Sequence, residues 1–232
     1  MIERYTLTCE ADSIRKQFGL DATAKYQKIY NGAPTHILPV VTNEHPDGFS
    51  FFYWGLPPNM TKNRPVSKKL INAENEQFRT RTSYKNALLS RRCLVPANGI
   101  FAWKKISKKG KIPYRYILND EKPFMMAGIW EEFETENKSG VHTFSIITIQ
   151  SEDKNPTFAP EIPIILEDED IEIWLDKKTD EGQLLNLISK TTQSHFGSYP
   201  VSSRINKIDL NTPDLIEPSS PMDQFGNYSL FD

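Results

Sequence analysis

Short apolar runs recur along the chain, and Gly, Pro and Asn residues bound them. Runs of this length that are rich in β-branched and aromatic residues are typical of strands. The pattern predicts strands at Phe49–Trp54, Tyr114–Leu118, Phe124–Trp130, Thr143–Ile149 and Ile162–Leu166.

Helical patterns are fewer. They cover Ala11–Phe18, Tyr84–Arg91, Glu169–Asp176 and Asp180–Ser189, and the third has acidic residues in its first turn, where they favour the helix dipole. Strands outnumber helices and do not alternate with them, so a doubly wound parallel sheet is disfavoured. The pattern instead predicts an α+β fold in which a mainly antiparallel, β-rich domain carries flanking helices.

Length and composition favour one globular domain. The chain has 232 residues, of which 38% are apolar and 25% charged, and this balance excludes collagen-like, disordered and membrane-spanning classes. We expect a single domain over residues 1–232, with 211–232 as a partly irregular tail rich in Pro, Ser, Asn and Asp. The lysine-rich segment Lys104–Lys111 has a Lys109-Gly110 step that predicts a hairpin tip, and we interpret it as a solvated turn.

The charge balance limits the partners. Lys plus Arg number 28 and Asp plus Glu number 30, a formal charge of -2, which argues against a protein coated in basic residues for duplex binding but allows a local basic cleft. The charged opening segment resembles no signal peptide, and no apolar stretch is long enough to span a membrane. These features predict a cytoplasmic protein with no membrane partner.

Motifs for cofactors and metals are missing from the sequence. Neither GxxxxGK[ST] nor GxGxxG occurs, and His36, His45, His142 and His195 are isolated, so we expect no cofactor and no metal site. The two cysteines, Cys9 and Cys93, lie in no recognisable motif. A Cys/His nucleophile pair stays open, because such partners are distant in sequence.

Nine segments, taken in order, resemble the SOS response-associated peptidase family, whose members process abasic sites in single-stranded DNA. They are MIERYTL, NGAPTHILPVV, WGLPP, LINAENEQF, RRCLVPANGIFAWKK, PFMMAGIWEEF, HTFSIITIQ, PEIPIIL and PVSSRIN with PDLIEP. The resemblance spans nearly the whole chain. It implies the fold of that family and a relation to abasic-site chemistry.

The resemblance also implies a covalent mechanism in the family. Its members begin Met-Cys-Gly-Arg, lose the Met, and use the amine and thiol of the cysteine to trap the ring-opened abasic sugar as a thiazolidine. An Asn orients the sugar, a Glu before a Trp transfers protons, and a His assists.

This chain departs from the family at those positions. Ile2 stands at the cysteine, Ala102 at the Glu and Ala159 at the His, whereas Arg4 and Asn72 are retained. Three reactive groups are therefore missing together, which predicts a catalytically degenerate member. Cys9 lies seven residues from the family position, at the start of the first predicted helix, and we discount it as a substitute.

A pocket that no longer reacts can still bind a single strand through a basic groove and stacking faces. The candidates for DNA contact are Arg4, Asn72, Arg79, Arg81, Trp54 and Trp103. Core packing is an equal alternative for the two tryptophans. Glu74 and Glu161 replace arginines of the family pattern and weaken the DNA interpretation.

Three hypotheses follow. The first is a family member that has lost its covalent chemistry and retains single-stranded DNA or other ligand binding. The second is an active hydrolase or peptidase with a site rebuilt around another nucleophile, such as Cys93 or a serine. The third is a partner-binding scaffold that binds no nucleic acid.

Overall fold

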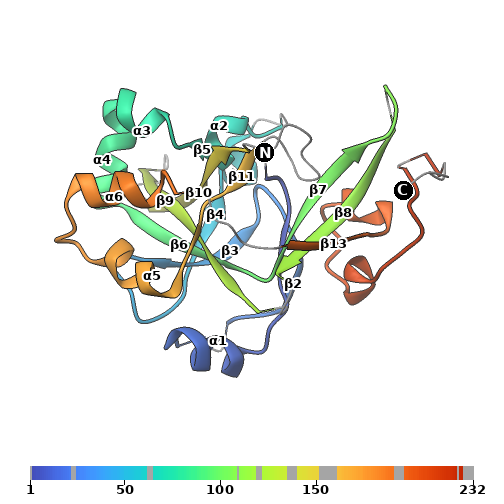
Figure 1. The fold of residues 1–232 in the computed structure, drawn as a ribbon, viewed down its shortest axis with the longest axis horizontal. Coiled ribbons are helices and arrows are strands. Elements are labelled where there is room, and N and C mark those ends of the chain that lie inside the picture. Colours follow the sequence, from blue (N-terminus) through green and yellow to red (C-terminus); the bar gives the residue numbers. More distant parts are fainter. Residues whose placement is uncertain are drawn as a thin grey trace.

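The structure is a computed structural model that describes residues 2–21, 25–61, 65–108, 110–118, 122–134, 140–151, 161–190, 196–223 and 225–226. Two antiparallel-rich sheets form its centre, and most of the helices lie on the left-hand side in Figure 1. This architecture confirms the predicted α+β class.

The larger sheet closes into a barrel, because its strands pair in the ring β10, β4, β3, β6, β9 and back to β10. The ring strands are β3 (Ile37–Thr42), β4 (Ser50–Trp54), β6 (Arg92–Ala97), β9 (Phe124–Glu134) and β10 (Gly140–Gln150). Three short strands extend the ring: β5 (Asn72–Glu74) and β11 (Glu161–Pro163) pair with β10, and β12 (Ile165–Leu166) pairs with β9.

The second sheet packs beside the barrel in the order β13, β8, β7, β1, β2. Its strands are β1 (Tyr5–Leu7), β2 (Ile29–Gly32), β7 (Gly99–Lys105), β8 (Lys111–Leu118) and β13 (Phe196–Pro200). Asn98 alone separates β6 of the barrel from β7 of this sheet. The N-terminal strand β1 lies between β7 and β2 in this sheet.

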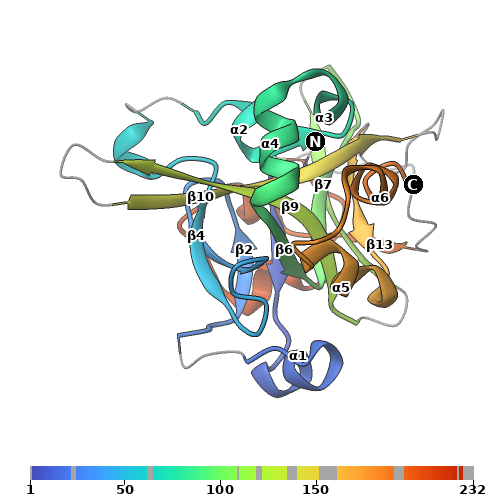
Figure 2. The same cartoon turned by 90° about the vertical axis from the view of Figure 1, so that its left-hand side faces the viewer.

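The helices cover the outside of the barrel. They are α1 (Ala11–Phe18), α2 (Lys68–Ile71), α3 (Gln77–Thr80), α4 (Thr82–Ser90), α5 (Asp168–Leu175) and α6 (Glu181–Leu187), with short 3-10 turns at Pro58–Met60, Ser203–Asn206 and Pro213–Ile216. Figure 2 faces this side and shows α4, α6 and α5 in front of the barrel strands. Buried Leu88, Trp174 and Leu184 of these helices pack on barrel residues such as Leu94 and Ile129.

A second core fills the barrel itself. Trp54 is fully buried there, with its ring centroid 5.3 Å from that of Tyr5 and 6.2 Å from that of Phe144. Cys93 and Met126 line the same interior and are fully buried too. Because side chains alternate along each strand, one set fills the barrel and the other meets the helices.

Most of the elements that the sequence predicts are confirmed. All four predicted helices are confirmed, with boundaries that differ by at most two residues, and the hairpin between β7 and β8 is confirmed by pairing from Ile100 with Tyr116 to Lys105 with Lys111. Lys109 lies outside the described residues. No helix among the described residues is long and apolar enough to cross a membrane.

One predicted strand is wrong in a specific way. The segment 162–166 is not a single strand: β11 pairs with β10 and β12 pairs with β9. Ile164 connects them, donating from its backbone to Ile147 at 3.0 Å and accepting from Ala127 at 2.8 Å. Pro163 lacks the N–H that continued pairing would need, so the chain changes partner there.

Candidate functional site

Residue 2 lies inside the molecule, beside Asn72. The Ile2 side chain is fully buried among barrel residues, and its carbonyl accepts a 2.8 Å hydrogen bond from the Asn72 Nδ2. Asn72 begins β5 and is held opposite Ile146 of β10. The structure therefore brings together the positions that the resemblance assigns to the nucleophile and to the sugar-orienting amide.

Two buried polar atoms lie on this face without a hydrogen-bond partner among the described residues. They are Asn72 Oδ1 and the hydroxyl of Thr148 on β10. Asn72 is opposite Ile146 and Glu74 is opposite Thr148, so all four side chains face the same side of the paired strands. Buried polar groups without a protein partner are normally satisfied by water or a ligand. Sequence analysis missed Thr148, whose only signal was a hydroxyl within an apolar run.

Arg4 places a positive charge near residue 2. The backbone N–H of Phe101 donates to the Arg4 carbonyl at 3.1 Å, which fixes Arg4 against β7. The guanidinium Nη1 donates to the Glu3 carbonyl at 2.6 Å, and Arg4 forms no ion pair among the described residues. Burial lowers the pKa of Arg4, although Glu3 opposes this, and an arginine stays charged at neutral pH.

A neighbouring imidazole responds to that charge. Burial lowers the pKa of His36, and the nearby Arg4 lowers it further, while Asp209 acts in the opposite direction. The His36 imidazole is therefore neutral at pH 7 and adds no second positive charge beside Arg4.

At the family's Glu position, the structure has an apolar cluster. Ala102 lies on β7, is 5% exposed, and packs with Ile112, Tyr114 and Tyr116. Burial raises the pKa of Tyr116 to about 12, so this phenol stays protonated. Ala159, at the family's His position, lies outside the described residues. Nothing in the Ala102 cluster replaces the missing carboxylate.

The two acidic replacements flank β10. Glu74 is opposite Thr148 on one side, and Glu161 is opposite Gln150 on the other. Thr148 and Gln150 are two residues apart, so both glutamates face the same side as Asn72. Glu74 is exposed, and the Gln77 amide contacts its carboxylate at 3.4 Å. This arrangement puts negative charge on the rim of the site.

The two tryptophans have different environments, and the prediction that Trp54 contacts DNA is wrong. Trp54 cannot stack on a DNA base, because its ring is fully buried in the barrel and its Nε1 donates to the Ile71 carbonyl at 2.9 Å. Trp103 is partly exposed, and its Nε1 donates to Asn206 Oδ1 at 3.1 Å. Because strand side chains alternate, Trp103 faces the other side of β7 from Ala102.

Arg79 and Arg81 lie further along the chain from Asn72, around α3. Both are exposed. Arg79 donates to the Ser189 hydroxyl at 3.2 Å, and the Arg81 guanidinium carbon lies 6.0 Å from the Tyr84 ring centroid. The charges of Arg81 and Glu74 both act on the pKa of Tyr84, Arg81 lowering it and Glu74 raising it, so the arginine and the glutamate lie near the same ring.

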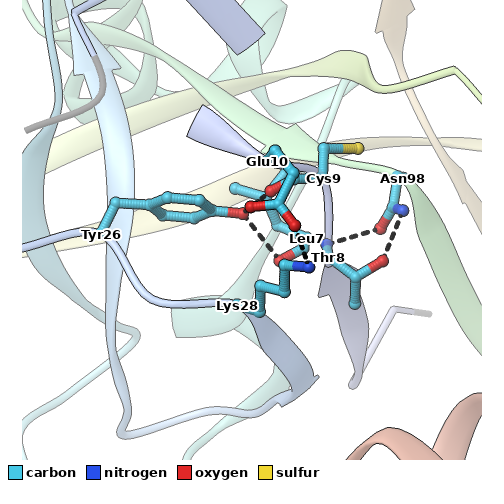
Figure 3. A network of polar contacts seen from close by, with 7 residues as sticks. All are labelled: Leu7, Thr8, Cys9, Glu10, Tyr26, Lys28 and Asn98. Atoms are coloured by element: carbon cyan, nitrogen blue, oxygen red, sulfur yellow. Dashed lines mark hydrogen bonds and ion pairs between the residues drawn. The ribbon is translucent and has the colours of Figure 1, made fainter. Parts of the chain in front are cut away.

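Cys9 belongs to a different part of the molecule. Figure 3 shows the polar network that fixes its segment: the Asn98 amide bonds the backbone and hydroxyl of Thr8, and the Tyr26 hydroxyl contacts the carbonyls of Leu7 and Cys9. Cys9 packs on the helix-covered core outside the barrel, whereas Ile2 belongs to the interior core. Burial raises the pKa of the Cys9 thiol, which disfavours the thiolate form that a nucleophile needs.

Cys93 is equally unsuited to catalysis. It is fully buried inside the barrel, and burial strongly raises the pKa of its thiol. The thiol stays protonated and out of reach of a substrate, which argues against the rebuilt hydrolase that uses it. Among the described residues, no three His, Cys, Asp or Glu side chains lie close enough to hold a metal ion.

Comparison with protein families gives a match over residues 1–208 to the model described as SOS response associated peptidase (SRAP). The chain is 33% identical to the abasic site processing protein YoqW of Bacillus subtilis over 222 residues, which cover 94% of this chain and 99% of YoqW. It is 26% identical to the abasic site processing protein HMCES of Rattus norvegicus, covering 84% of this chain and 66% of HMCES.

Solved structures share the fold. A Bacteroides thetaiotaomicron protein superposes with a TM-score of 0.77 at 22% identity, covering 93% of this chain and 99% of that one. A Bordetella bronchiseptica protein gives 0.70 at 18% identity, with 86% and 99% covered. At these identities the superpositions establish the architecture alone.

Proposed function

Because this chain belongs to the SOS response associated peptidase family, we propose that it binds single-stranded DNA at the family's site without forming a covalent bond to it. The observation that carries the proposal is the Ile2–Asn72 pair. The hydrogen bond from Asn72 to the Ile2 carbonyl holds these two positions of the site together. The buried Ile2 side chain offers no thiol.

The proposal of non-covalent binding rests on charged and polar groups that a DNA strand would pair with. Arg4, which forms no ion pair among the described residues, supplies a positive charge for a phosphate, and Asn72 Oδ1 and the Thr148 hydroxyl supply unsatisfied polar atoms for a sugar or a base. Arg79 and Arg81 add positive charge near the rim. Single strands are bound by such basic tracks together with stacking faces. Glu74 on the same rim opposes the strand and limits its affinity.

The loss of covalent chemistry is supported by two further positions. Ala102 removes a carboxylate from a cluster that contains no other acid among the described residues, and Ala159 removes an imidazole. Proton transfer by such groups contributes typically about 10² to 10⁴-fold to a rate. A thiol supplied by another residue would therefore have no acid or base at the positions that Ala102 and Ala159 occupy.

Binding measured by fluorescence anisotropy tests the proposal. A labelled single strand should bind, and log Kd should vary with log salt by about 0.7 per neutralised phosphate. Glu74→Arg should tighten binding, because it removes the repelling charge from the rim. Glu172→Arg on exposed α5 changes the net charge equally and serves as the matched control.

The expected result is tighter binding by Glu74→Arg than by Glu172→Arg. Binding that responds to neither salt nor Glu74→Arg would contradict the proposal and favour the partner-binding scaffold. Absence of any binding to single strands would have the same meaning.

A further inference from the structure

The β7–β8 hairpin projects from the body of the molecule as a two-stranded ribbon (Figure 1). Its tip is closed by bonds from the N–H groups of Ile106 and Ser107 to the Gly110 carbonyl, at 3.0 and 3.3 Å, and from the Gly110 N–H to the Ser107 hydroxyl at 2.7 Å. We call residues 99–108 and 110–118 the hairpin arm.

The arm carries a concentration of positive charge. Lys104, Lys105, Lys108 and Lys111 are all exposed and lie within eight consecutive positions. Lys105 and Lys108 form no ion pair among the described residues. Asp223 of the C-terminal segment lies against Gly110. The arm is therefore a basic strip in a chain whose formal charge is -2.

The base of the arm lies at the candidate site. The Phe101 N–H bonds the Arg4 carbonyl, and Ala102 is the next residue of β7. A strand advances about 3.3 Å per residue, so Lys105 lies about 10 Å beyond Ala102 and Lys108 lies further out. Phosphates of a stacked strand follow one another at about 3.4 Å along its axis. A strand leaving the site along the arm would therefore present several phosphates to these lysines.

The arm also offers a face for a base or sugar. The Lys104 Nζ lies 5.6 Å from the centroid of the Tyr114 ring, and Lys104 and Ala102 share one side of β7. Lys104 is thus on the same side as the candidate site, whereas Lys105 and its cross-strand partner Lys111 are on the Trp103 side, so the lysines of the strip border both faces of the ribbon. Phosphate contacts on this strip would offset the negative charge that Glu74 and Glu161 bring to the rim.

We propose that the hairpin arm is a second contact surface for single-stranded DNA, which binds the phosphates of the strand outside the site. This inference rests on the proposed function and extends it from a pocket to a track. Only strands long enough to reach from Arg4 to Lys108 would contact both the site and the tip of the arm. Binding along a basic surface needs no base recognition and depends strongly on salt.

The test compares labelled oligothymidylates of about 3 and about 24 nucleotides; at about 3.4 Å per step the shorter strand spans about 7 Å and does not reach from the site to Lys105, whereas the longer one does. The variant is Lys105→Gln/Lys108→Gln, which removes two exposed charges and no described contact. Lys177→Gln/Lys178→Gln, in the exposed turn between α5 and α6, is the control with the same charge change. Anisotropy titrations are run at about 50 and about 200 mM salt.

The long strand should lose two phosphate contacts in the arm variant, so the salt slope should fall by about 1.4. Between the two salt concentrations this is about a 7-fold smaller change in Kd than for the wild type. The short strand and the control variant should be unaffected. An unchanged slope for the long strand in the arm variant overturns the inference and leaves the proposed function standing.

Other outcomes separate the two proposals. If the wild type binds neither oligonucleotide, both fail. If the arm variant weakens binding but Asn72→Leu does not, the arm binds DNA and the proposed site does not. If duplex or RNA of equal length binds more tightly and depends equally on the arm, the assignment to single-stranded DNA is overturned.

Discussion

Asn72 and Thr148 each bring a buried polar group to one face of the β5–β10 pair, and the two groups differ in what they bind. The Asn72 Nδ2 satisfies the Ile2 carbonyl, while its Oδ1 and the Thr148 hydroxyl have no partner among the described residues. Removing a partner from a buried carbonyl is destabilising, whereas removing an unsatisfied hydroxyl is not. The stability of the free protein should therefore separate a structural bond from a binding group.

Asn72→Leu should lower the free energy of unfolding by about 1 to 3 kcal/mol, because the Ile2 carbonyl is left buried without a donor. Thr148→Val keeps the shape of the side chain and should be neutral or slightly stabilising in the free protein. Urea unfolding followed by circular dichroism measures both. Equal losses for the two variants would contradict this description of the site.

Some residues of the site could be predicted from the sequence, and others could not. Ile2, Ala102 and Ala159 follow from matching segments to a family pattern, and Asn72 follows in the same way. Thr148 required the register of β5 against β10, which no local pattern specifies. The burial of Trp54 depends on closure of the barrel, and an aromatic residue ending a strand does not indicate which side it faces.

At the scale of elements, Arg92 connects two helices to the barrel. It is fully buried on β6, and its guanidinium donates to the carbonyls of Trp174 and Asp176 at 2.6 and 2.7 Å and of Leu88 and Leu89 at 2.8 and 2.9 Å. These carbonyls belong to the ends of α4 and α5, which have no intrahelical donors. One side chain thus caps both helices.

Arg92→Lys should destabilise the protein by roughly 3 kcal/mol, because an ammonium cannot reproduce the planar fork and leaves buried carbonyls without donors. Arg15→Lys is the control, since Arg15 lies on the surface in an exposed ion pair with Asp21, and should change stability by less than about 0.5 kcal/mol. Chemical denaturation measures both variants. A loss for Arg92→Lys no larger than for Arg15→Lys would show that the cap is dispensable.

The helices were predictable because each has its own periodicity and boundary residues, as Gly19 in the left-handed conformation shows at the end of α1. Strands β3 and β6 were missed although they are buried, because Pro39 and Pro96 interrupt them. Pairing explains why these prolines are tolerated. β3 and β6 pair with each other at Val41 with Leu94 and Thr42 with Cys93, so neither proline lies opposite the other strand.

At the scale of the whole molecule, the C-terminal segment is part of the fold beyond β13. The Asn31 amide donates to the carbonyls of Lys207 and Leu210, each at 3.0 Å. Asn211 Oδ1 accepts from the backbone of Tyr30 and Asn31, at 2.7 and 3.2 Å. These contacts attach the segment to β2 and support the proposal that the chain is one domain.

Negative and positive side chains lie on different parts of the molecule. Negative residues face the site's rim at Glu74 and Glu161, and positive residues lie on the hairpin arm and at Arg4. The formal charge of -2 conceals this separation. An average composition excludes a broadly basic DNA-binding protein, but it does not exclude a local basic surface, because local fields depend on where charges lie.

The most direct test of the central claim is covalent capture of an abasic site. The protein is incubated with single-stranded DNA that contains an abasic site, without reductant, and is then heated and run on a denaturing gel. A family member that begins Met-Cys-Gly-Arg serves as the positive control, and anisotropy on the same mixture measures non-covalent binding. Because Ile2 offers no thiol, we predict binding without a heat-stable shifted band. A heat-stable protein–DNA adduct would contradict it.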